Sequence, residues 1–137
     1  MTRANRLGYM IAVTAVFAIA LYNAFWFALD IGVRLGLIRG IVFGIDAPNF
    51  TAALTVWNEV FFFAAAIASF IAAPCILMRS RWALWAFGTC FAAGVSDWIM
   101  LIANPYYDGS GAGLATTVAT IATLALLLLL RWRRVLN

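Results

Sequence analysis

Lysine and histidine are absent from this chain, and acidic residues are scarce. All nine basic side chains are arginine, against five aspartates and glutamates in 137 residues. Without histidine the chain lacks the usual ligand of zinc and haem iron and the usual proton relay. It also lacks a Ser-His-Asp set, a phosphate-binding glycine loop after a strand, and paired acids within one motif. We therefore expect no enzymatic activity, no metal and no cofactor.

Cysteine is almost as rare. Cys75 and Cys90 are the only two, and they do not have the spacing of a metal site or a redox motif. Both lie inside long apolar runs, where a free thiol behaves as a small apolar side chain. We expect both to pack in the core.

Apolar residues, in contrast, are in large excess. The chain is 66% hydrophobic and 10% charged, whereas ordinary soluble domains are about half apolar and a quarter charged. In lipid the backbone must satisfy its own hydrogen bonds, so long apolar runs fold as helices. The composition predicts one integral membrane domain over residues 1–137, of the all-α class.

Four apolar runs are long enough to cross a bilayer as helices. They cover residues 7–29, 57–78, 82–103 and 114–130. A cleavable signal peptide is the alternative for the first run, because its start is basic. That run is too long for a signal sequence and no small-residue cleavage site follows it, so we predict a transmembrane helix. The expected fold is a four-transmembrane-helix bundle.

The segment 30–56 between the first two spans has a regular glycine pattern. Glycine recurs at every fourth position, at Gly32, Gly36, Gly40 and Gly44. On a helix this spacing makes a smooth ridge for close helix packing. We predict a short interfacial helix over 31–43, too charged to span because of Arg34 and Arg39, followed by a turn at 46–49. The alternative is a loop in which the glycines are turn residues.

Arginines cluster at the ends of the predicted spans. If the N-terminus is cytoplasmic, seven lie on the inner side (Arg3, Arg6, Arg79, Arg81, Arg131, Arg133 and Arg134) and two, Arg34 and Arg39, on the outer side. The positive-inside rule then predicts that both termini are cytoplasmic. The same positions favour topology and lipid headgroup contact over a nucleic-acid partner.

With this topology all five acids fall toward the outer side: Asp30, Asp46, Glu59, Asp97 and Asp108. Asp97 alone lies well inside a span, about 9 Å from its outer end. A charge at that depth costs a few kcal/mol or more, so we expect it to face protein or a wet cavity. Its helical neighbours form a stripe of small and polar residues that fits this expectation: Ala86, Cys90, Ala93 and Asn104.

The other three spans carry polar residues at a comparable depth, namely Asn23, Glu59 and Thr120. With Asp97 they would form an outward-facing pocket for a ligand or an ion. The alternative is structural: a protonated Asp97 bonded to Asn23 or to a threonine, joining two helices. Glu59 lies near the membrane–water interface, where the free-energy cost of a charged carboxylate is small, so we interpret it as structural. Thr116, Thr120 and Thr123 are expected to bond carbonyls of their own helix or to pack against a neighbouring helix.

Three features resemble a known group. An acid starts the second span (Glu59), a long apolar loop follows the first, and a basic turn precedes a tryptophan-started third span (Arg79-Ser80-Arg81-Trp82-Ala83). This layout resembles the small four-helix inner-membrane proteins of the DoxX-like group, and it is similar to short bacterial membrane proteins labelled sugar transporters. The resemblance implies a four-helix fold in a bacterial inner membrane and little about activity.

Two functions follow from these patterns. The first is an accessory or structural subunit packed in a larger membrane assembly, favoured by the glycine ridge and the missing catalytic set. The alternative is a small oligomeric transporter or ligand-binding protein with its pocket centred on Asp97. The expected partners are the lipid bilayer and either a second copy of the chain or a larger membrane complex.

Overall fold

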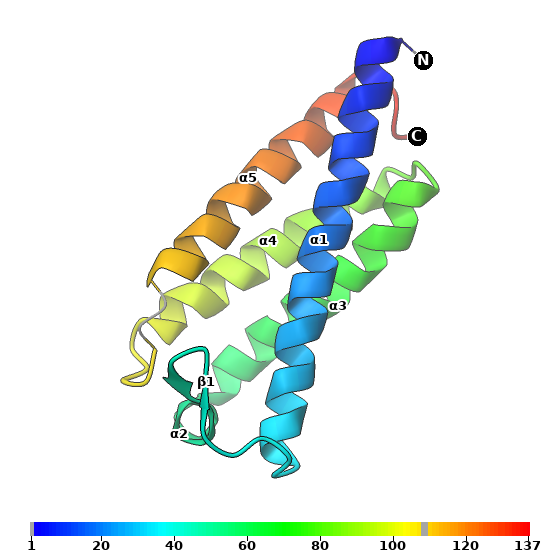
Figure 1. Cartoon of the computed structure of the whole chain (residues 1–137). Helices are drawn as coiled ribbons and strands as arrows, with labels where there is room; N and C mark the ends of the chain where they lie inside the picture. The colour runs from blue at the N-terminus through cyan, green and yellow to red at the C-terminus, as the bar shows by residue number, and fades with distance from the viewer. Residues whose placement is uncertain (1, 108–109) are drawn as a thin grey trace.

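A computed structural model describes residues 2–107 and 110–137 of the chain. Its main elements are four long helices, α1 (Arg3–Arg34), α3 (Val56–Leu77), α4 (Trp82–Leu101) and α5 (Ser110–Trp132) (Figure 1). All four are long and apolar enough to cross a membrane. By helix length and composition the chain is therefore a multi-pass membrane protein. α1 continues to Arg34, whereas the predicted first span ended at Leu29. Asp108, predicted to lie toward the outer side, is outside the described residues.

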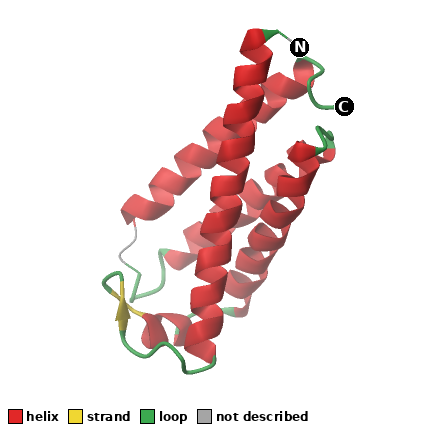
Figure 2. Ribbon diagram, turned by 45° about the vertical axis from the view of Figure 1, so that its right-hand side comes forward, coloured by secondary structure: helices red, strands yellow, loops and turns green. Residues whose placement is uncertain are grey.

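Both chain ends and the turn between α3 and α4 meet at one end of the bundle, which we name the terminal end (Figures 1 and 2). The Tyr9 hydroxyl donates a hydrogen bond to the carbonyl of Ile76, at 3.0 Å. The backbone N–H of Asn137 donates to the carbonyl of Arg79, at 2.7 Å. The opposite end holds the connection from α1 to α3, and we name it the hairpin end.

The four helices form a ring in which α1 and α4 each pack against α3 and α5. In the half near the terminal end the ring is filled by fully buried side chains: Ala12, Val16, Ile76, Phe87 and Leu127. A second cluster between α3 and α4 is made of small residues: Ala65, Ala68, Cys90 and Ala93. Toward the hairpin end α1 and α5 diverge (Figures 1 and 2). The large-residue core therefore occupies one half of the bundle only.

The predicted helix over 31–43 is wrong. α1 ends at Arg34, and the N–H groups of Gly36 and Leu37 donate to the carbonyls of Val33 and Gly32, both at 2.9 Å. This is a Schellman ending, in which Gly36 has a φ of +69° that only glycine adopts without strain. Instead of a helix, the next residues form a two-stranded hairpin.

The hairpin consists of β1 (Ile41–Val42) and β2 (Ile45–Asp46), paired antiparallel. Gly40 directly precedes β1 and Gly44 directly precedes β2, with φ values of +126° and +84°. Three of the four regularly spaced glycines are thus turn residues, as the alternative interpretation held, and they build no helical ridge. Gly32 does allow a close approach, but of the loop: an added Cβ would lie 2.7 Å from Cδ1 of Ile38.

A short helix does form in this connection, at α2 (Ala47–Ala52), where a turn was predicted at 46–49. The Asp46 carboxylate caps it by accepting a hydrogen bond from the N–H of Asn49, at 3.3 Å. Pro48 lies in the first turn, where its missing N–H costs nothing. The segment predicted as a turn therefore starts a helix. An aspartate side chain that accepts a bond from a following backbone N–H is found both in turns and at helix N-caps, so this sequence fits either structure.

A candidate ligand pocket at the hairpin end

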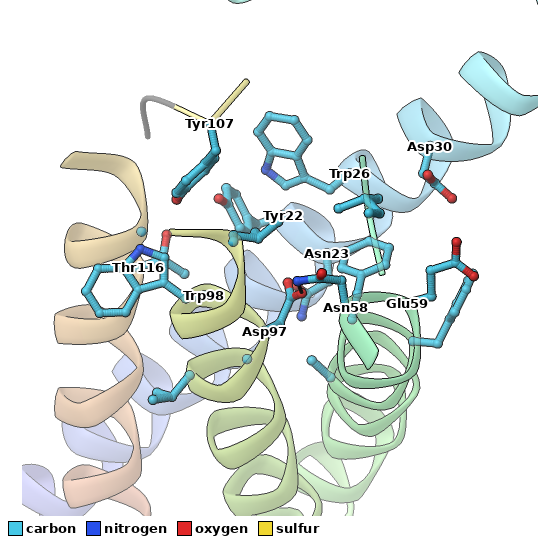
Figure 3. A pocket seen from close by; sticks show the side chains of 18 of the residues that line it. Tyr22, Asn23, Trp26, Asp30, Asn58, Glu59, Asp97, Trp98, Tyr107 and Thr116 are labelled. Atoms are coloured by element: carbon cyan, nitrogen blue, oxygen red, sulfur yellow. Dashed lines mark hydrogen bonds between the residues drawn. The ribbon is translucent and has the colours of Figure 1, made fainter. Parts of the chain in front are cut away.

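A pocket of about 320 Å³ lies between the diverging helices and the α1–α3 connection. It is lined by one predicted residue from each long helix, Asn23 of α1, Glu59 of α3, Asp97 of α4 and Thr120 of α5. Figure 3 shows Asn23, Asn58 and Asp97 grouped at the centre of the site, with Glu59 at its side next to Asp30. The structure therefore brings together the four side chains that depth matching had placed at one level.

Asp97 faces protein, as its stripe of small neighbours predicted. Cys90, Ala93 and Asn104 on that stripe are buried, and Oδ1 of Asp97 accepts a hydrogen bond from Nδ2 of Asn58, at 3.3 Å. The partner predicted from the sequence was Asn23 or a threonine, and that prediction is wrong. Asp97 is instead joined to α3, the helix with which α4 packs most extensively.

Asn58 is oriented toward Asp97 by the start of its own helix. Its Oδ1 accepts hydrogen bonds from the N–H and the hydroxyl of Thr55, at 3.1 and 2.7 Å. In return the Thr55 Oγ1 accepts from the Asn58 N–H, at 3.3 Å, which completes a capping box. Because the cap uses the amide oxygen, the amide nitrogen is left to point at Asp97. The local signal that starts α3 thus also positions a pocket residue.

The other predicted polar residues form hydrogen bonds with groups other than Asp97. Asn23 donates to Sγ of Cys90, at 3.8 Å, which joins α1 to α4 across the pocket. Thr120 and Thr123 donate their hydroxyls to the carbonyls of Thr116 and Ala119, at 2.7 and 2.8 Å, as predicted. With its proton used inside α5, the Thr120 hydroxyl faces the pocket as a hydrogen-bond acceptor.

An ion-pair triad lies at the rim. Arg34 contacts Oδ2 of Asp30 through Nε, at 2.8 Å, and Oε1 of Glu59 through Nη2, at 2.9 Å. The triad links the end of α1 to the start of α3, which agrees with the structural role expected for Glu59. The side chains of Arg34 and Glu59 are 37% and 34% exposed, so solvent screening holds each pair to roughly 1 kcal/mol or less.

Aromatic side chains make up a third of the lining. They come from α1, the α1–α3 connection, α3, α4 and the loop after α4, whereas the described residues of α5 contribute none. The aromatic residues are Tyr22, Trp26, Phe43, Phe50, Phe62, Phe63, Phe91, Trp98 and Tyr107. The ring of Trp26 is held by edge contacts with Tyr22 and Phe25, at centroid distances of 6.1 and 5.7 Å. The pocket is therefore a mainly apolar, aromatic space with a few polar groups, which is the usual composition of a small-molecule site.

Neither Trp26 nor Trp98 was predicted from the sequence to line the pocket. The indole nitrogens of Trp26 and Trp98 are buried, and neither has a hydrogen-bond partner within the described chain. Nε1 of Trp98 faces Gly113 of α5 so closely that an added Cβ there would overlap the ring. Helical spacing could have predicted that Trp26 lines the pocket, because Trp26 lies about one turn beyond Asn23 on the same face of α1.

Comparisons with known protein families, with curated proteins and with solved structures found no match to this chain. The resemblance to the DoxX-like group therefore stays a prediction. Function has to be argued from the pocket itself.

Proposed function

We propose that this chain is a small ligand-binding membrane protein, which takes up a compact, largely apolar molecule in the pocket at the hairpin end. The observation that carries the proposal is the combination of aromatic walls with polar groups from all four long helices at one level. A bundle that served only to hold four helices together would gain stability by filling this space, because empty volume forfeits packing contacts.

The proposed setting is a bacterial inner membrane with both termini in the cytoplasm. Seven of the nine arginines lie on the terminal end: Arg3, Arg6, Arg79, Arg81, Arg131, Arg133 and Arg134. The positive-inside rule assigns that end to the cytoplasm. A ligand would then reach the pocket from the outer face of the membrane.

The accessory-subunit interpretation stays a prediction, but it has lost one of its two supports. It rested on a helical ridge of glycines, and Gly36, Gly40 and Gly44 are turn residues instead. The proposal of a ligand-binding protein keeps its support, which was the convergence of polar residues around Asp97.

The test uses two glycines of α4 that both have open space around them, one inside the pocket and one outside it. An added Cβ at either Gly94 or Gly88 meets nothing within 4 Å, and of the two only Gly94 lines the pocket. Gly94→Leu should fill the pocket without distorting the backbone, and Gly88→Leu is the matched control. Binding of naphthalene-sized aromatic probes, one neutral and one cationic, is measured by equilibrium dialysis against the protein in lipid nanodiscs.

We expect saturable binding of at least one probe after subtraction of empty nanodiscs. Gly94→Leu should abolish it and Gly88→Leu should leave it unchanged. No saturable binding of either probe, or equal binding to both variants, would overturn the proposed function.

A further inference from the structure

We propose that the pocket selects a hydrophobic organic cation, that is, a positively charged group on an aromatic or other apolar body. This inference rests on the proposed function and adds the sign of the ligand's charge. It follows from the charge balance of the lining and from the distribution of the aromatic rings.

The charged side chains of the described lining are three carboxylates and one guanidinium: Asp30, Glu59, Asp97 and Arg34. The guanidinium is ion-paired with both Asp30 and Glu59, so its single positive charge is already outweighed by two carboxylates. Among the described residues Asp97 has no basic partner, and its single hydrogen bond comes from a neutral amide. A carboxylate inside a membrane span is stable when a cation or water faces it. A bound cation would supply the charge that the chain does not.

An anionic ligand would meet the opposite situation. The other arginine of the α1–α3 connection, Arg39, donates its Nε to the carbonyl of Gly36 and does not line the pocket. No described basic group is therefore left to receive an anion, whereas the Asp97 carboxylate would repel one. Charge alone favours cations over anions here.

A neutral ligand is the remaining alternative, and the buried indole N–H groups of Trp26 and Trp98 would favour one that carries an acceptor. Two observations weigh against it. The Trp98 N–H edge faces Gly113 of α5, and an unpaired carboxylate costs more in an apolar site than an unpaired neutral N–H. A cation also gains from the aromatic walls, because the face of each ring attracts positive charge.

The experiment compares N-methylquinolinium with 1-methylnaphthalene. Both consist of two fused rings and one methyl group, and they differ by one positive charge. The protein is held in nanodiscs of zwitterionic phosphatidylcholine, so that the lipid does not concentrate the cation, and binding to empty nanodiscs is subtracted. We expect the cation to bind with a dissociation constant at least about tenfold lower than that of the neutral probe.

Asp97→Asn tests the source of the preference. The substitution keeps the side-chain shape and an acceptor for Asn58, so only the charge is lost. We expect it to remove the preference for the cation and to leave binding of the neutral probe within about twofold. Asp46→Asn is the matched control, because it removes a carboxylate from the same end of the molecule, outside the pocket, and asparagine caps α2 equally well.

The outcomes separate this inference from the proposed function. If the neutral probe binds as well as the cation, the charge assignment is wrong and the pocket stands. If Asp97→Asn keeps the preference, Asp97 is not its source and the inference fails. If neither probe binds saturably, both proposals fall. The ratio measured on the unaltered protein decides the charge assignment even where a variant does not fold.

Discussion

The Asn58 side chain both supports the start of α3 and bonds to α4, and double-mutant cycles can separate the energies of these two contacts. Its carbonyl oxygen completes the capping box with Thr55, and its amide nitrogen donates to Asp97. The residue is 5% exposed, so neither lost bond is readily replaced by water. We predict that Asn58→Ala lowers the free energy of unfolding through both contacts.

The magnitudes follow from the geometry. Asn58→Ala removes the two bonds that Thr55 donates to Oδ1, which together contribute about 1 kcal/mol, and it leaves the N-cap bond to the residue 58 N–H in place. An interhelical hydrogen bond in a membrane protein contributes about 0.6 kcal/mol on average. Asn58→Ala should therefore cost about 1.5–2 kcal/mol. The coupling energy of Asn58 with Asp97 should be about 0.6 kcal/mol and that with Thr55 about 1 kcal/mol, because the contact to Asp97 is one bond at 3.3 Å.

The assay is reversible unfolding by sodium dodecyl sulfate in mixed micelles, followed by circular dichroism. Each cycle compares two single alanine variants with the double variant. Thr89 supplies the control partner, because its exposed side chain bonds only the carbonyl of Trp85 in its own helix. Its coupling with Asn58 should be zero within error, as for other sites that share no contact.

One result would refute the assignment of Asp97 to a bond with α3. If its coupling with Asn58 equals that of the Thr89 control while all variants fold, the two side chains do not interact. A coupling of Asn58 with Asp97 that exceeds its coupling with Thr55 would contradict the predicted order of the two coupling energies. It would mean that the contact to Asp97, rather than the cap, is the main role of Asn58.

Two further predictions concern the backbone. Gly113→Ala places a Cβ against the indole of Trp98, so it should lower the free energy of unfolding by about 1–3 kcal/mol; Gly88→Ala, which has open space, should cost nothing in the same assay. Arg134 has a φ of +54°, a conformation that costs a non-glycine residue about 1–2 kcal/mol. Arg134→Gly should therefore raise the thermal midpoint relative to Arg134→Ala, which removes the same charge, and equal midpoints would argue against strain there.

The four helices were predictable from the sequence because lipid leaves an apolar run no other way to satisfy its backbone. The α1–α3 connection was not. A four-residue glycine spacing suits a helical ridge and a series of turns equally, and only the hairpin pairing of Ile41 with Asp46 decides between them. That pairing joins residues only five positions apart, but two residues per strand carry no periodic signal.

The common depth of the predicted pocket residues could be derived from the sequence for a related reason, whereas their convergence could not. Helix rise fixes the depth of Asn23, Glu59, Asp97 and Thr120 from their positions in the spans. Hydrogen-bond partners depend also on helix rotation, which the sequence did not specify. The hydrogen bond from Asn58 to Asp97 could have been proposed from the Thr55 capping box, because the box uses the amide oxygen of Asn58 and leaves its amide nitrogen free to donate to another helix.

The position of the pocket follows from the sizes of the residues that face the bundle axis. In the terminal half Ile76, Phe87 and Leu127 fill the ring completely. In the hairpin half the lining includes Ala65 and Gly94, which leave space where α1 and α5 diverge. Packing and binding are therefore carried by opposite halves of the same four helices. The filled half can hold the helices in place while the open half accepts a ligand, so a substitution that enters open space, as at Gly94, need not weaken the fold.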